Sequence, residues 1–108
     1  LVYFGIKNYT KAIEDFDKAI AIKLNYPSAH LSKGSALFVM GKTEDAIINF
    51  SNAITYEPKY GDAYYNRAIA HLSVGKYNNA LLDALKAKEV GVNVPDGLFV
   101  DIQKGLSK

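Results

Sequence analysis

Residues 27–60 read PSAHLSKGSALFVMGKTEDAIINFSNAITYEPKY, and the 34 residues that follow, 61–94, repeat the same plan. Alanines mark the repeat most clearly, because two sets of three stand 34 residues apart: Ala12, Ala46 and Ala80, and Ala19, Ala53 and Ala87. Self-similarity at this period predicts a stacked array of one supersecondary unit, in which each unit buries an apolar face that it cannot bury alone.

Each period is expected to hold two helices. Ser28 can cap the first helix, and Gly41 ends it because glycine adopts the left-handed backbone that stops a helix. The second helix begins at Thr43, with acidic side chains near its positive end, and stops before Pro58. Apolar residues within it recur at the spacing of one helical face.

Extended to the whole chain, this pattern predicts six helices and a helical stub. The helices are expected over 10–23, 29–40, 43–57, 62–74, 79–90 and from 95 onward, with the stub at 1–6. The predicted organisation is one array: a truncated first repeat at 1–26, repeats at 27–60 and 61–94, and a C-terminal capping helix at 95–108. The fold class is therefore all-α, an α-solenoid of antiparallel helix pairs.

Small side chains explain why such pairs can form. Gly34 on a first helix is expected to contact Ala46 and Ala53 on the second, because small residues let two backbones approach closely. Phe50, like Phe16 one period earlier, is expected to fill the gap between neighbouring pairs.

The residues at these positions resemble the tetratricopeptide repeat (TPR) family over essentially the whole chain. The matching residues are Tyr3, Ala12, Phe16 and Ala19 in the first period, Gly34, Ala46, Phe50, Ala53 and Pro58 in the second, and Tyr64, Ala68, Ala80 and Ala87 in the third. The resemblance implies a right-handed superhelix whose concave surface is lined by the first helix of each pair.

Four positions depart from the family pattern. Ala84 stands where Phe is expected, Val92 where Pro is expected, and Lys7 where Gly is expected. His30 stands where the family favours a large aromatic residue. We expect a smaller contact at Ala84 and a different exit from the helix near Val92.

Composition excludes several classes of function. The net charge is +2 and the basic residues are spread along all 108 residues, which argues against a nucleic-acid surface. No cysteine is present, so disulfides and thiolate chemistry are excluded. The longest apolar run is far below the roughly 18 residues of a membrane helix, and no signal peptide is recognisable. We expect no membrane partner, a cytoplasmic location, and a larger parent protein, since no Met begins the chain.

The residue pattern does not predict an enzyme. His30 and His71 are the only histidines, and neither belongs to a recognisable catalytic motif. Residues 36–43 read ALFVMGKT, close to a phosphate-binding loop, but the first glycine and the preceding strand are missing. We expect no catalytic residue, no metal site and no cofactor.

The predicted function is a protein-interaction scaffold that holds a peptide or partner helix in its concave groove. Spacing along the first helices places seven residues on that face: Leu31, Ser35, Phe38, Asp62, Tyr65, Asn66 and Ile69. Tyr65 offers a rigid ring and Asn66 an amide for a peptide backbone, which suits an apolar ligand held by a few hydrogen bonds.

Two alternatives stay open, and one ligand class is disfavoured. The face of residues 12–20 would be partly exposed in a truncated first repeat and could support homo-oligomers. An enzyme or nucleic-acid binder on the same scaffold is the third possibility. Some TPR domains clamp acidic chaperone tails; Asn66 fits one clamp position, but basic partners are absent because Leu31, Ser35, Asp96 and Val100 occupy the other registers.

Overall fold

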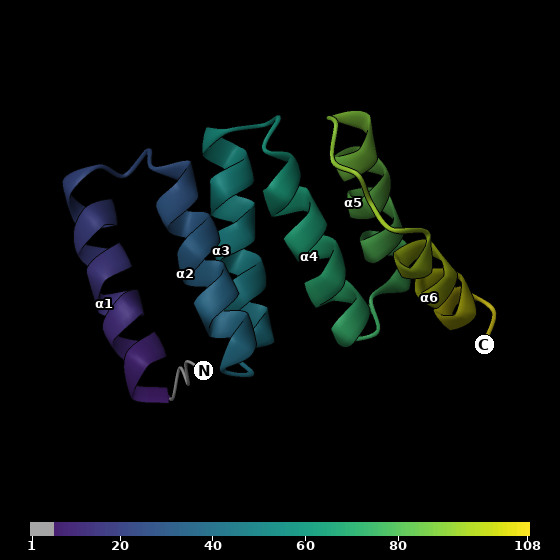
Figure 1. The fold of residues 1–108 in the computed structure, drawn as a ribbon, viewed down its shortest axis with the longest axis horizontal. Helices are drawn as coiled ribbons and strands as arrows, with labels where there is room; N and C mark the ends of the chain where they lie inside the picture. Colours follow the sequence, from purple (N-terminus) through teal and green to yellow (C-terminus); the bar gives the residue numbers. More distant parts are fainter. Residues whose placement is uncertain (1–5) are drawn as a thin grey trace.

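The computed structural model describes the backbone of residues 6–108 and the side chains from Asn8 onward. The described chain holds six helices and no strand: α1 (Ile6–Ile22), α2 (Pro27–Val39), α3 (Thr43–Tyr56), α4 (Gly61–Ser73), α5 (Tyr77–Glu89) and α6 (Asp96–Leu106). They follow one another along a row from the N-terminal to the C-terminal end (Figure 1). The predicted all-α architecture is confirmed.

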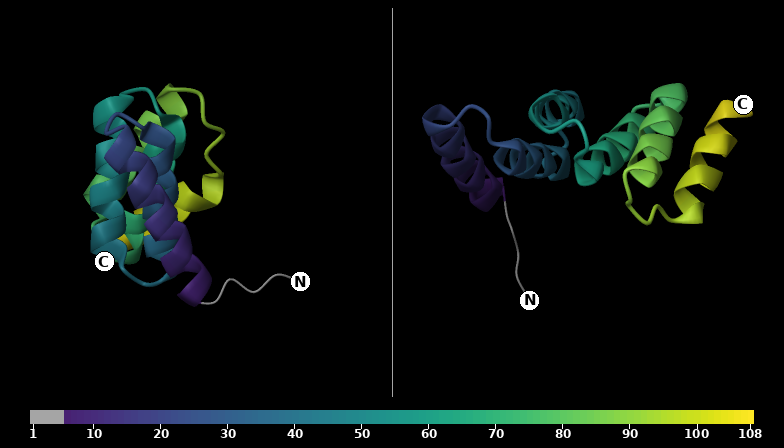
Figure 2. Two further views of the ribbon diagram at one scale, coloured as in Figure 1. Left: turned by 90° about the vertical axis from the view of Figure 1, so that its left-hand side faces the viewer. Right: turned by 90° about the horizontal axis from the view of Figure 1, so that it is seen from above.

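The helices form antiparallel pairs that stack side by side. The closest packing joins α2 to α3 and α4 to α5, and the α3–α4, α1–α2 and α5–α6 contacts link these pairs into one array. Seen from above, α2 and α4 lie on one side of the array and α3 lies on the other (Figure 2). The array is elongated, with extents of 42 × 29 × 25 Å. This is the alternation that a stack of helix pairs requires.

Three glycines end helices in the predicted manner. Gly41, Gly75 and Gly91 have φ angles of +82°, +77° and +107°. In each turn the next amide reaches back to the last helical turn, so that Lys42 N–H donates to the Leu37 carbonyl at 2.9 Å. Because an L side chain strains this backbone, glycine fixes where α2, α4 and α5 stop.

Two boundary predictions are wrong. A turn was expected before Thr10, yet α1 begins at Ile6 and continues without interruption to Ile22. Lys7 holds the register of the turn glycines, and a side chain there disfavours the left-handed backbone, so the helix continues. Ser28 does not cap α2, because the helix already starts at Pro27, whose fixed φ suits a first helical position. The rest of the predicted stub, residues 1–5, lies outside the described residues.

The first core cluster joins α2, α3 and α4. Leu37, Ala46, Phe50 and Ala70 pack together, and Phe50 is 2% exposed. A Cβ built on Gly34 would lie 2.6 Å from Phe50 Cε1 and 3.2 Å from the Ala46 carbonyl oxygen, which confirms the predicted approach of Gly34 to Ala46. Ala70 of α4 belongs to the same cluster as Phe50, which agrees with the prediction that this ring lies between neighbouring pairs. The Gly34–Ala53 contact stays a prediction.

The second cluster joins α4, α5 and α6. Ala68, Ala80, Ala84 and Ile102 are all 0% exposed and pack against one another. Ala84 is small where an aromatic residue was expected, and Ile102 of α6 packs there. The C-terminal helix thus contributes Ile102 to the core of the last pair.

Candidate functional site

The seven predicted groove residues lie on two neighbouring helices of the same row, α2 and α4. Leu31, Ser35 and Phe38 come from α2, and Asp62, Tyr65, Asn66 and Ile69 come from α4. Asp62 is exposed and the other six are partly buried. Each of the two helices is the first of its pair, since α2 packs on α3 and α4 packs on α5. The stacking of the pairs also brings α2 into contact with α4.

Two of these side chains also serve the core. Leu31 and Phe38 pack against the cluster of Leu37, Ala46 and Phe50, so part of their surface is already used for folding. A substitution at either position would therefore change stability as well as binding. This makes them poor reporters of a ligand.

Tyr65, Asn66 and Ile69 form the clearest candidate surface. They are partly exposed and none of them belongs to either core cluster. Within residues 8–108, the Asn66 amide makes no side-chain hydrogen bond. A ring, an amide and an aliphatic side chain on one helical face can hold an extended or helical peptide through apolar contact and backbone hydrogen bonds.

The next residue along α4, Arg67, belongs to a polar network inside the stack. Its Nε and Nη2 donate to the two carboxylate oxygens of Asp83 on α5 at 2.7 and 2.8 Å, and Nη1 donates to Ser51 Oγ on α3 at 3.0 Å. Asp83 is 6% exposed. The hydrogen bond with Asp83 raises the pKa of the Arg67 guanidinium, although burial opposes this. The Arg67 guanidinium thus links three successive helices, through an ion pair with α5 and a hydrogen bond to α3.

His71 lies beside this network and is buried. Its Nε2 is 3.6 Å from Asp83 Oδ2, and its Nδ1 has no hydrogen-bond partner among the described residues. Burial lowers the pKa of His71, and the nearby charge of Asp83 opposes that shift only in part. Among the described residues, no nucleophilic side chain is hydrogen-bonded to Nδ1 of His71. The arrangement of an acyl-transfer triad, in which a histidine joins a carboxylate to a nucleophile, is therefore not formed by these residues.

Sequence reasoning missed the Arg67–Asp83 pair, although a signal was present. Asp83 lies between Ala80 and Ala87, in the stripe of small residues that packs against α4. A buried carboxylate needs a partner of opposite charge. Arg67 is next to Ala68, the small residue of α4 that faces the small residues of α5. The pairing of Arg67 with Asp83 could therefore have been inferred.

His30 has a structural role in place of the aromatic residue typical of its position. Its ring stacks on Tyr56 with centroids 5.5 Å apart and an interplanar angle of 22°. Its Nε2 lies 3.0 Å from the Leu24 carbonyl oxygen and donates to it in the matching tautomer. The histidine therefore joins the start of α2 to the end of α3 and to the preceding loop.

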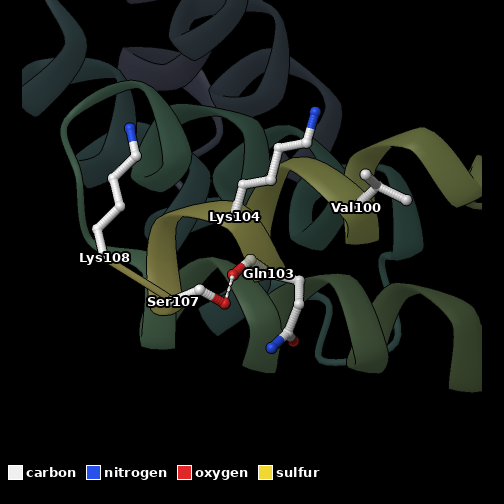
Figure 3. A pocket seen from close by; sticks show the side chains of 5 residues that line it. All are labelled: Val100, Gln103, Lys104, Ser107 and Lys108. Carbon is white, nitrogen blue, oxygen red and sulfur yellow. Dashed lines mark hydrogen bonds between the residues drawn. The ribbon is translucent and has the colours of Figure 1, made fainter.

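Two hollows lie at the ends of the array. A cavity of about 690 Å³ lies between α1 and α2, and its lining includes Phe16, Leu31 and Ser35. A second, of about 490 Å³, lies on the outer side of α6. Figure 3 shows that Lys104 and Lys108 extend to one side of this hollow and Gln103 to the other, with Ser107 Oγ donating to the Gln103 carbonyl at 2.9 Å.

Among the described residues, no group of three or more His, Cys, Asp or Glu side chains is placed to hold a metal ion. None of the described helices is both long and apolar enough to cross a bilayer.

Comparison with known families identifies the repeats. A family model described as TPR repeat matches residues 34–75, and one described as tetratricopeptide repeat matches residues 1–26; together they span more than half of the chain. No curated protein shows significant sequence similarity to it.

Solved structures share the fold at low sequence identity. The first TPR of Spaghetti (RPAP3) bound to the HSP90 peptide SRMEEVD is 22% identical, with a TM-score of 0.82 over 94% of this chain and 79% of that chain. The TPR2B domain of yeast Sti1, in a pHsp70 complex, is 20% identical, with a TM-score of 0.83 over 91% and 85%. Yersinia enterocolitica SycD, in complex with a peptide of the translocator YopD, is 20% identical, with a TM-score of 0.77 over 94% and 79%.

Proposed function

Because the chain belongs to the tetratricopeptide repeat family, we propose that it is a peptide-binding scaffold and that the face of α2 and α4 is its groove. Structures with this fold bind peptides: an HSP90 peptide in Spaghetti and a YopD peptide in SycD. The observation that carries the proposal for this chain is the set Tyr65, Asn66 and Ile69, which is partly exposed and outside both core clusters.

The chemistry of the groove favours an apolar or neutral peptide over an acidic tail. The registers that would hold a basic clamp carry Leu31, Ser35, Asp96 and Val100. Asp62 adds a second carboxylate at the start of α4. Burial raises the pKa of Tyr60, and the negative charge of Asp62 is the smaller, second cause of that shift. An acidic peptide such as SRMEEVD would face carboxylates in this groove, whereas a basic clamp would offer it cations. The like charges therefore disfavour such a peptide.

A peptide array screened with the whole chain tests this function. We expect captured sequences to carry apolar anchors without an excess of acidic residues. Tyr65→Ala and Asn66→Ala should each weaken binding of the captured peptide several-fold. The first variant removes the contact with the ring, and the second removes the hydrogen bonds of the amide. Leu82→Ala on α5, where Leu82 is 66% exposed, is the matched control and should bind normally. Unchanged binding in both groove variants would disprove this location.

Self-association is the second candidate, and one observation favours it. Ala12 and Phe16 on α1 stay partly exposed, whereas the residues one period later, Ala46 and Phe50 on α3, are buried. Light scattering across a concentration series tests this. A mass that rises with concentration, and that Ala12→Asp returns to the monomer value, would support association through α1; a constant monomer mass would reject it.

A further inference from the structure

A carboxylate without an ion-pair partner stands at the start of α4. Asp62 lies in the first turn of that helix and is exposed. It makes no ion pair within residues 8–108, whereas four other carboxylates do: Asp17, Glu44, Asp83 and Glu89. A carboxylate in a first turn interacts favourably with the positive end of the helix dipole. That accounts for Asp62 as a helix residue, but not for the side chains beside it.

A ring and an amide lie one helical turn beyond Asp62. Tyr65 and Asn66 follow it by three and four residues, the spacing at which helical side chains are neighbours on one face. Both are partly exposed and outside the two core clusters. A carboxylate and an amide oxygen accept hydrogen bonds from a cation, and the face of an aromatic ring attracts it. Together the three side chains therefore offer the contacts that a lysine or arginine head group needs.

Among α2, α4 and α6, only α4 carries all three groups. The repeat places the same registers on α2 and α6, 34 residues before and after. On α2 these registers hold neither a charge nor a ring, and on α6 the amide is missing; the residues are Ser28, Leu31 and Ser32, and Asp96, Phe99 and Val100. On α6 a cation already lies over the ring, because Lys88 Nζ is 5.9 Å from the centroid of Phe99. The face of Tyr65 has no such cation among the described residues.

The two nearest basic residues along the chain do not fill this position. The guanidinium of Arg67 is held by Asp83. Lys59 precedes α4 and forms no ion pair within residues 8–108, and Glu57 in the same loop carries the opposite charge. Asp62 therefore leaves this end of α4 with a net negative charge, although the chain as a whole has a net charge of +2. A cationic group on a ligand is complementary to it.

We propose that Asp62, Tyr65 and Asn66 (the α4 corner) bind an arginine side chain of the peptide in the groove. Arginine suits the corner better than lysine, because its planar guanidinium can pair with a carboxylate and also stack on a ring. Ile69, one turn further along α4, then receives an apolar residue of the same peptide. The inference rests on the proposed groove and adds the chemical class of its ligand, a peptide that combines one cation with apolar residues.

A charge scan of the ligand tests the α4 corner. The probes are peptides rich in valine, leucine and serine, in which a single arginine, or its uncharged isostere citrulline, is moved through every position. They are arrayed and screened with the whole chain, and the best arginine peptide and its citrulline counterpart are then compared by fluorescence anisotropy. We expect the arginine peptide to bind about three- to tenfold more tightly, since an exposed ion pair and an exposed cation–π contact each contribute modestly.

Variants of the chain locate the arginine. Asp62→Asn and Tyr65→Leu should each bring the ratio of the two affinities toward one, and Asp62→Lys should prefer the same peptide with glutamate in place of arginine. Asp96→Asn is the matched control, because Asp96 also lies in the first turn of a helix, but Lys88 already lies over the ring of Phe99 in that register. It should keep the full preference for arginine. Thermal melting confirms that each variant folds.

The outcomes separate the α4 corner from the groove. Equal affinity for the arginine and citrulline peptides, with both weakened by Tyr65→Ala, would disprove the cation site while the groove stands. A preference for arginine that survives in folded Asp62→Asn, or that is lost equally in Asp96→Asn, would place the arginine elsewhere and overturn the proposal. Binding of none of the peptides would overturn the groove and the corner together.

Discussion

Arg67 on α4 holds the buried carboxylate of Asp83 on α5 through two hydrogen bonds of 2.7 and 2.8 Å, across a sequence separation of 16 residues. The paired geometry is the planar fork that guanidinium groups make with carboxylates. Since the same guanidinium also donates to Ser51 on α3, this ion pair fixes how the last pair stacks on the one before it.

Arg67→Met should destabilise the fold by about 3 kcal/mol, because it leaves the carboxylate of Asp83 buried without a charged partner. The double variant Arg67→Met with Asp83→Leu should recover most of that loss, since the unpaired charge is removed. Urea denaturation measures both. Lys86→Met is the control: Lys86 pairs with Glu89 at 3.2 Å on an exposed surface, and its loss should cost less than about 1 kcal/mol. Equal losses in Arg67→Met and Lys86→Met would contradict the buried role.

Stability should fall as the pH drops below about 6.5, the ordinary pKa of histidine. Burial lowers the pKa of His71 in the folded chain, with Asp83 opposing the shift and Arg67 and Lys76 adding to it. The unfolded chain then binds a proton at higher pH than the folded chain. The free energy of unfolding therefore decreases as the solution is acidified. The contribution is complete above the unfolded pKa and is lost toward the lower folded pKa.

Urea midpoints between about pH 5.5 and 7.5 test the histidine effect, above the range in which ordinary carboxylates titrate. His71→Asn should have a flatter pH dependence than the parent chain over that interval. If the two slopes are the same, another group is responsible for the acid sensitivity.

Gly34→Ala should destabilise the protein by roughly 1–3 kcal/mol, because its methyl group would overlap the Phe50 ring. Gly97→Ala in α6 is a matched control: nothing lies within 4 Å of a Cβ there, so the same change should be neutral or stabilising by about 0.5–1 kcal/mol. Differential scanning calorimetry separates the two. A parallel shift of both melting temperatures would show that packing against Phe50 is not the cause.

Ala46→Leu and Ala80→Leu should each cost roughly 1–3 kcal/mol, since both positions are 0% exposed between paired helices. Ala12→Leu is the informative comparison. It occupies the same register on α1 but borders the open cavity, so the larger side chain should be accommodated at little cost. Lys42→Leu, at an exposed turn, should leave the stability nearly unchanged. Equal melting temperatures for Ala46→Leu and Lys42→Leu would refute the packing assignment.

Positions governed by backbone geometry could be predicted from the sequence. Gly41, Gly75 and Gly91 stop helices because their left-handed φ angles suit glycine, and the repeat places the small residues on facing sides. Lys7 shows the limit of the same reasoning: the register alone predicted a turn there, but the residue in that register is not glycine, and α1 runs through it.

The candidate groove could be predicted only as a helical face. Spacing placed Leu31, Phe38 and Tyr65 on the same row of helices, and the structure puts all three on α2 and α4. Spacing could not separate side chains already committed to the core, such as Leu31 and Phe38, from those outside it, such as Tyr65. That distinction depends on which neighbours approach in three dimensions.

By itself, the sequence determined the helices, their period and the stacking of pairs, because these follow from local backbone preferences and from small residues recurring every 34 positions. Only the tertiary structure decided that Arg67 pairs with Asp83 and that Ile102 packs beside Ala84. It also decided that Phe16 on α1 lines a cavity together with residues of α2. Such contacts join side chains on different helices, so they depend on the relative placement of those helices, which no single stretch of the chain encodes.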